Sequence, residues 1–298
     1  MNELKRRFAK DCKIPIPVTE NFDYYMDLYG DHFHFQEHYD EFQRLLKTFS
    51  GSDITGQFLD AEETLMKRII EVIQKTDAYQ SFQQMDMSKY GKLTAYPKTN
   101  IYSQAFIGKR LVSIDLEQAN FQALSHVSSD LVLGAESYRE LVMKFTPYSY
   151  YWNSKGFRSC LFGNLNPKRQ QKIEEKLIRE VLDFMKEHYE ISIVSVLSDE
   201  LILEMDPIHE ESLKEILEST LGLKVHVKQF QLTSIVSPKD GQIYGYVKEF
   251  EEGNPSFKAV NGDLFPQVFK FYYGMEINEK DLEFRHMGKT ARFVEPIF

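Results

Sequence analysis

Residues 195–206, SVLSDELILEMD, place apolar runs on either side of a short polar segment that contains Asp199 and Glu200. Runs rich in Val, Ile and Leu that are separated by small and acidic residues are typical of two strands joined by a tight turn. The stretch therefore predicts a β-hairpin. Its tip carries two neighbouring carboxylates, which need water, a cation or a binding partner.

The segments around the hairpin predict the rest of the fold. In RLVSIDLE, residues 110–117, apolar side chains alternate with Ser113 and Asp115, which is the period of a strand. The expected elements are, in order, this strand, a helix at 117–127, a helix at 166–189 opened by Pro167, the hairpin, a helix at 207–222 and a strand at 223–235. This order predicts an α+β fold, with an antiparallel sheet and helices packed on one face.

The chain divides into three expected regions. Residues 1–90 are predicted to be mostly helical, and residues 91–236 contain the α+β layer. Residues 237–298 are predicted to form a small β-rich C-terminal extension, with strands at 243–250 and at 267–274, where the sequence is QVFKFYYG.

Composition limits the possible function classes. The chain has 298 residues and a net charge of −9, which argues against binding to nucleic acid through bulk charge but not against a local basic cleft. Two cysteines, Cys12 and Cys160, are too few for a disulfide framework and favour a reducing cytoplasm. We expect no membrane span and no secretory signal, because no apolar run is long enough.

Asp115 and Asp199 are the main candidates for chemistry. If the hairpin lies beside the first strand, both carboxylates point into one cleft, where they repel unless a proton or a cation is bound. A hard cation such as Mg²⁺ or Mn²⁺ would resolve the repulsion, and pairs of such ions serve phosphoryl and nucleotidyl transfer. The alternative is that Asp199 and Glu200 are turn residues and that Asp115 caps a strand end.

The N-terminal region contains three closely spaced histidines in DHFHFQEHYD. His32, His34 and His38, beside Glu37, have a spacing that a zinc ion accepts. The alternative is a polar segment with interleaved aromatic residues, because no cysteine or further histidine cluster completes the site.

Residues 91–130, GKLTAYPKTNIYSQAFIGKRLVSIDLEQANFQALSHVSSD, resemble the motif A segment of the superfamily A DNA polymerases. The similarity lies in Gly-Lys-Leu-Thr, in the Ala-Phe strand, and in the run from Asp115 to His126. SVLSDELILEMD resembles motif C of that family, in which a His-Asp-Glu turn joins two strands. Together with the following helix and LKVHVKQF, the resemblance covers residues 90–236, about half of the chain, and implies a palm domain.

The resemblance implies roles for the acidic residues. Asp115 and Asp199 would bind the metal ions, the carbonyl of Leu116 would be a further ligand, and Glu200 would be an accessory acid near the primer end. Asn120 stands where motif A of the family has a Glu that helps to exclude ribonucleotides, so the choice between dNTP and NTP stays open.

The resemblance also implies roles for basic residues. Lys92 stands where the family has Arg, and would contact the primer-template backbone beside Gly91. Lys155 and Arg158 in SKGFRSCLFGN fit the spacing of the fingers residues that bind the triphosphate, although the segment also fits a later, template-contacting helix. We further expect phosphate contacts from cationic side chains beside the cleft, at Lys98, Lys109 and Arg110.

The chain departs from the family in several places. Ser198 replaces the His of motif C, the distance between the two motifs requires reduced fingers, and nothing resembles a proofreading nuclease. Residues 1–90 would have to act as a small helical thumb. These features are similar to compact polymerase relatives of phages and mobile elements.

The sequence therefore favours a template-directed nucleotidyltransferase, foremost a DNA polymerase. Its expected partners are primer-template nucleic acid, nucleoside triphosphates and replication proteins. An RNA polymerase or primase is the alternative within the same chemistry. A non-catalytic palm that binds nucleic acid or a replication partner, and an unrelated α+β protein, are the alternatives outside it.

Overall fold

The computed structural model describes residues 2–90, 93 and 95–298 as two compact units. The first unit contains residues 1–59, 154–156 and 232–298, and the second contains residues 60–153 and 157–231. The three regions expected from the sequence divide the chain differently. The C-terminal residues share a unit with the N-terminal helices, and residues 60–90 belong with the sheet that carries Asp115.

The main sheet has six strands in the order β2-β3-β1-β4-β5-β6. The strands are β1 (Arg110–Leu116), β2 (Ile191–Val196), β3 (Glu200–Met205), β4 (Val225–Val236), β5 (Ile243–Glu249) and β6 (Ser256–Lys258). The pairs β2–β3, β1–β3, β1–β4 and β5–β6 are antiparallel. The predicted hairpin, the first strand and the strand at 223–235 are therefore confirmed, as is the α+β fold class.

The alternation in β1 decides which side chains enter the core. Val112, Ile114 and Leu116 are all at most 2% exposed, and apart from Gln229 in β4, opposite Val112, the residues opposite them in β3 and β4 are also apolar. Because residues directly opposite one another in an antiparallel pair share a face, these positions form one apolar surface. Ser113 and Asp115 lie on the other face, as the sequence predicts.

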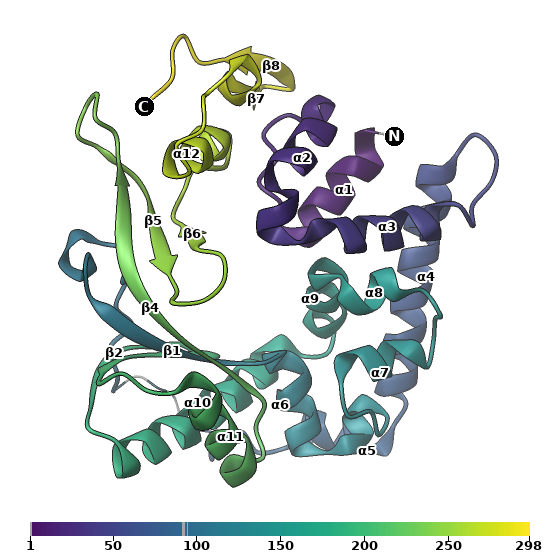
Figure 1. The fold of residues 1–298 in the computed structure, drawn as a ribbon. Helices are drawn as coiled ribbons and strands as arrows, with labels where there is room; N and C mark the ends of the chain where they lie inside the picture. Colours follow the sequence, from purple (N-terminus) through teal and green to yellow (C-terminus); the bar gives the residue numbers. More distant parts are fainter. Residues whose placement is uncertain (1, 91–92, 94) are drawn as a thin grey trace. The chain divides into compact units, whose positions relative to one another are not determined.

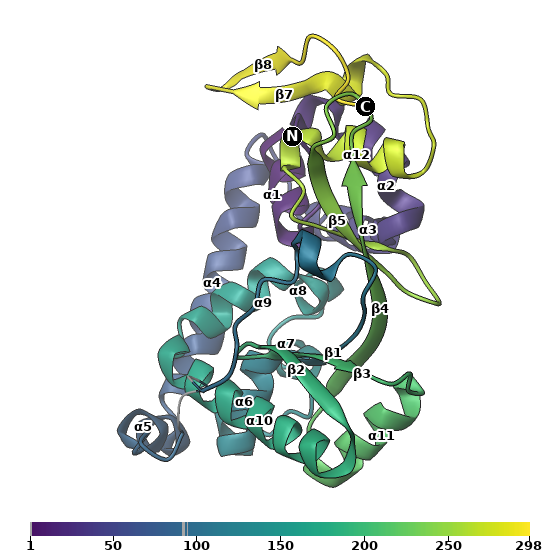
Figure 2. The same cartoon turned by 90° about the vertical axis from the view of Figure 1, so that its left-hand side faces the viewer.

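Three helices of the second unit cover one side of β1, β2 and β3, as Figure 1 and Figure 2 show. They are α6 (Ala119–Val127), α10 (Pro167–His188) and α11 (Glu210–Leu221). Pro167 opens α10, where its missing N–H is not needed, and Gly222 ends α11 in the left-handed conformation at φ +67°. The inner stripe of α10 is fully buried and comprises Ile173, Leu177, Ile178, Val181, Leu182 and Met185.

In the part of the chain that the structure describes, five further helices lie wholly or partly in the second unit. They are α5 (Asp77–Gln84), α7 (Tyr138–Met143), α8 (Ser149–Asn153), most of α9 (Lys155–Gly163) and the larger part of α4 (Ile54–Gln74), with 3-10 turns at Gln104–Phe106 and Ser129–Val132. Among the described residues, no helix is both long enough and apolar enough to cross a membrane.

The first unit joins the two ends of the chain. It contains α1 (Asn2–Cys12), α2 (Phe22–Phe33), α3 (Phe35–Leu46), α12 (Phe265–Tyr272), the hairpin of β7 (Glu283–His286) and β8 (Lys289–Arg292), and 3-10 turns at Thr19–Asn21, Gly262–Leu264 and Glu279–Leu282. The ring of Tyr29 on α2 packs edge-on against Phe265 and Phe269 of α12, with centroids 5.5 and 5.1 Å away. Aromatic packing of this kind adds to the area term and fixes α12 against α2.

The predicted strand at 267–274 is wrong, because these residues form most of α12. Aromatic and β-branched residues suggested a strand, but Phe265, Phe269 and Tyr272 recur at helical spacing and face the core. Pro266 stands in the first turn, and Gly274, at φ +64°, follows the helix end. Residues 265–270 are all buried, including the polar Gln267 and Lys270, so α12 has no exposed polar face of the kind that normally identifies a surface helix.

Candidate functional site

The end of β1 meets the tip of the β2–β3 hairpin. Asp115 lies directly opposite Glu200, and the N–H of Leu116 donates to the carbonyl oxygen of Asp199 at 2.8 Å. The turn is closed by a hydrogen bond from the N–H of Leu197 to the carbonyl oxygen of Glu200, also 2.8 Å. Two acids that are 84 positions apart, Asp115 and Asp199, are thus held on neighbouring stretches of backbone.

Glu200 is held on the same face of the sheet as Asp115. The hydroxyl of Ser113, two residues before Asp115, donates to Oε1 of Glu200 at 2.6 Å. Burial, and then the charge of Glu200, raise the pKa of the nearby Tyr102 to about 12, so this phenol keeps its proton at neutral pH. Neither Ser113 nor Tyr102 could be identified from the sequence as a neighbour of Glu200, because the Ser113 contact depends on the strand register and Tyr102 lies in a loop before β1.

Glu174 on α10 is the acidic residue of this site that the sequence analysis missed. Its side chain is 5% exposed, and Asn120 on α6 donates from Nδ2 to its Oε1 at 2.7 Å. Burial raises the pKa of Glu174 to about 7, and the negative charge of Asp199 adds to the rise. Asp199 therefore lies close enough to α10 for its charge to affect Glu174.

A signal for Glu174 was present in the sequence. Residue 174 is four positions before Ile178 and seven before Val181, so it lies on the buried stripe of α10, where an apolar residue is expected. A charged carboxylate on a buried stripe lowers the stability of the fold unless it is paired or protonated, so such a residue is often retained for a function. Glu174 therefore marks the position at which α10 passes beneath the site.

The donor set fits a magnesium ion. Mg²⁺ is usually held by one or two carboxylates and completed by water and substrate phosphate. Asp115 and Asp199 supply two carboxylates, and the raised pKa of Glu174 shows that a further anion is disfavoured there. Within the described residues, no three or more His, Cys, Asp or Glu side chains are grouped so as to hold a metal ion. If such an ion binds at this end of the sheet, the carboxylates of Asp115 and Asp199 are the candidates to hold it, because the backbone hydrogen bond from Leu116 to Asp199 joins the two segments.

The basic residues at the start of β1 lie far along the strand from the carboxylates. Arg110 is five residues before Asp115, which corresponds to about 17 Å of strand. Lys109 binds Glu204 at 3.0 Å and lies 5.5 Å from the ring centroid of Phe106. Lys98 is exposed and forms an isolated β-bridge with Ser195 of β2. Any phosphate contacts by Lys109 and Arg110 would thus be remote from Asp115, whereas Lys98 lies beside the end of β2 that leads into the hairpin turn.

The candidate triphosphate ligands lie on one short helix. Lys155 is the exposed first residue of α9, and Arg158 lies one turn later with its guanidinium 5.7 Å from the ring centroid of Tyr138. The boundary between the compact units falls between these two residues. Gly91 and Lys92, the candidates for backbone contact, lie outside the described residues.

The histidine cluster does not come together, so the zinc interpretation is not supported. Nδ1 of His32 hydrogen-bonds with the hydroxyl of Tyr273 at 2.8 Å, whereas Nδ1 of His38 contacts Oε2 of Glu41 at 3.2 Å. His34 ends α2 in a left-handed conformation and is exposed. The break between α2 and α3 at His34 separates the other two histidines, which the sequence spacing alone did not reveal.

We expect Glu174→Gln to flatten the pH dependence of stability in metal-free buffer. The folded protein holds the Glu174 proton up to about pH 7, whereas the unfolded chain releases it near 4.5. Wild-type stability should therefore fall as pH rises through this window, by about 3 kcal/mol at most. Glutamine still accepts from Asn120 and carries no charge, so the variant should lose this decline.

Urea denaturation at pH 4.5 and pH 8, with EDTA present, measures this difference. Glu187→Gln removes an exposed acid from the same helix and should leave the wild-type profile almost unchanged. Parallel profiles for wild type and Glu174→Gln would contradict the raised pKa.

No protein-family model matches this sequence, and no curated protein matches it either.

Proposed function

We propose that this chain is a template-directed nucleotidyltransferase, foremost a DNA polymerase, that uses Mg²⁺ or Mn²⁺. The observation that carries the proposal is the meeting of Asp115 and Asp199 at the end of β1 and the tip of the hairpin. If Asp199 served only the turn, there would be no physical reason for a second acid, Asp115, on the adjoining strand and for the buried Glu174 nearby. The motif A and motif C resemblance supports the same assignment.

In the proposed reaction, the 3′-hydroxyl of a primer attacks the α-phosphorus of a nucleoside triphosphate. A new P–O bond forms, the bond to the β-phosphate oxygen breaks, and pyrophosphate leaves. Bound divalent cations would lower the pKa of the hydroxyl and neutralise charge on the phosphates. Asp115 and Asp199 would fix these ions, and the hydrogen bond from Ser113 would hold Glu200 beside the primer end.

The nucleotide pocket would be bordered by α6. Asn120 is oriented by its hydrogen bond to Glu174 and is smaller than the glutamate of the resembled family. The amide neither fills the space beside the sugar nor offers a carboxylate to it. Both dNTPs and NTPs are therefore candidate substrates.

Primer extension tests the proposal. Purified protein is mixed with a labelled primer on a DNA or an RNA template, with Mg²⁺ or Mn²⁺, and dNTPs or NTPs are supplied separately. We expect template-dependent extension that requires the divalent ion and weakens with added salt, because the backbone is bound through phosphate contacts. A folded protein that extends no primer under any of these conditions would contradict an enzymatic role and favour a non-catalytic palm.

A further inference from the structure

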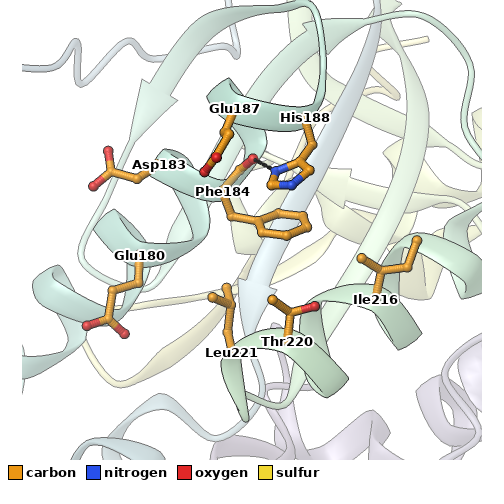
Figure 3. Close-up of a pocket in the computed structure, with 8 residues that line it drawn as sticks. All are labelled: Glu180, Asp183, Phe184, Glu187, His188, Ile216, Thr220 and Leu221. Carbon is orange, nitrogen blue, oxygen red and sulfur yellow. Dashed lines mark hydrogen bonds between the residues drawn. The ribbon is translucent and has the colours of Figure 1, made fainter.

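A groove of about 580 Å³ lies between α10 and α11 on the second unit. Figure 3 shows Phe184 and His188 on α10 facing Ile216 and Leu221 on α11. The groove is distinct from the carboxylate site, because Phe184 is ten residues beyond Glu174, or about 15 Å along the helix.

The side of the groove formed by α10 carries a stacked pair of rings that is held in place by a hydrogen bond. The rings of Phe184 and His188 stack with centroids 4.2 Å apart and an interplanar angle of 19°. Nδ1 of His188 donates to the carbonyl oxygen of Phe184 at 2.9 Å, which fixes the imidazole over the phenyl ring. On the opposite wall, Ile216 is 41% exposed. A large apolar side chain beside a fixed aromatic pair is typical of a surface that binds another molecule.

The rim of the groove is acidic. Glu180, Asp183 and Glu187 follow one another along the α10 wall, and none of the described residues that line the groove is a lysine or arginine. Glu180 is partly neutralised by Lys176 at 3.2 Å, so Asp183 and Glu187 dominate the local charge. The groove also adjoins the C-terminal end of α10, where the helix dipole is negative. All these charges favour a cationic occupant and disfavour nucleic acid.

We propose that this groove docks an amphipathic helix of a partner protein, whose apolar stripe covers Phe184 and Ile216 and whose lysines or arginines face Asp183 and Glu187. A groove between two packed helices accepts a third helix through ridges and grooves, with apolar anchors one turn apart. The basic helix of this chain, α1, does not fit the role in a second copy, because its apolar residues Leu4 and Phe8 are 3% and 0% exposed in the first unit.

Binding of a designed peptide tests the proposal. The probe is a fluorescein-labelled 14-residue peptide of leucine and lysine at helical spacing, and the control peptide has glutamate in place of every lysine. Fluorescence anisotropy with the full chain should show salt-sensitive binding of the lysine peptide only. Asp183→Lys/Glu187→Lys and, separately, Ile216→Ser should each weaken this binding about tenfold or more.

Glu215→Lys is the matched control, because it reverses an exposed charge next to Ile216 that does not line the groove. It should leave binding within about twofold of wild type. Equal loss in Glu215→Lys, no effect of Ile216→Ser, or binding of the glutamate peptide would overturn the proposal. So would concentration-dependent dimerisation that Ile216→Ser abolishes, since the occupant would then be a second copy of the chain.

Discussion

Asp199→Asn is expected to reduce primer extension by about 10³-fold or more, because bound metal ions contribute several kcal/mol to the transition state and each 1.4 kcal/mol or so is a factor of ten. The substitution keeps the shape of the side chain and the backbone hydrogen bond that Asp199 accepts from Leu116. Its main effect is therefore the loss of one negative charge at the hairpin tip. Single-nucleotide incorporation under saturating dNTP measures the change.

Asp206→Asn is the matched control for this experiment. Asp206 follows the far end of β3, away from the hairpin tip, and is exposed. Asp206→Asn removes the same charge as Asp199→Asn and should leave the rate of primer extension close to that of the wild type. Asp115→Asn should match Asp199→Asn, and the double variant should be little worse than either, because groups that act as a unit are not additive. Independent, modest losses would argue against a shared ion.

Stability distinguishes the catalytic role of Asp199 from a structural one. The charge of Asp199 helps to raise the pKa of Glu174, so its removal relieves a repulsion within the folded protein. Asp199→Asn should therefore be at least as stable as wild type at pH 8 in metal-free buffer. A variant that is clearly less stable would show that Asp199 serves the turn itself.

The local sequence pattern was enough to predict β1 to β4 and the helices α6, α10 and α11, but not the register between the strands or the helices α7, α8 and α9. In 110–116, apolar and polar residues alternate with the two-residue period of a strand, and the polar residues at 198–200 interrupt two apolar runs, so both strands of the hairpin and β1 could be predicted locally. Glu200, and not Asp199, lies opposite Asp115. This pairing depends on the length of the turn, because a register shift of one residue would place Asp199 opposite Asp115 instead. The contact between Ser113 and Glu200 was hidden for the same reason.

Other features required the tertiary structure. The partner of Glu174 is Asn120, 54 positions away, and its raised pKa depends on how α10 rotates against α6. The helix α12 looked like a strand because it is rich in aromatic and β-branched residues, which local patterns associate with strands. Its packing partner, α2, lies more than 230 residues earlier in the chain, beyond the range of local periodicity.

Asp281→Asn should destabilise the first unit by about 3–5 kcal/mol, which is the usual effect of breaking a buried ion pair. Nζ of Lys270 lies 2.8 Å from Oδ2 of Asp281, and the two side chains are 8% and 0% exposed. Asp281 also accepts hydrogen bonds from the hydroxyl of Tyr24 and the N–H of Asn278, at 2.6 and 2.7 Å. The carboxylate therefore connects α2, α12 and the segment after α12, and its loss leaves a buried ammonium without its counter-ion.

Hydrogen exchange of the α2 and α12 amides measures this loss within the unit, and we expect it to be at least about 10²-fold faster. Asp23→Asn is the matched control, because Asp23 pairs with Lys5 at the same distance of 2.8 Å but is 78% exposed. An exposed pair contributes under about 1 kcal/mol, so exchange should change little. Adding Lys270→Met to Asp281→Asn should restore part of the protection, since it removes the stranded charge. If the second substitution worsens exchange, the cost would come from lost packing around Lys270 and not from its unpaired charge.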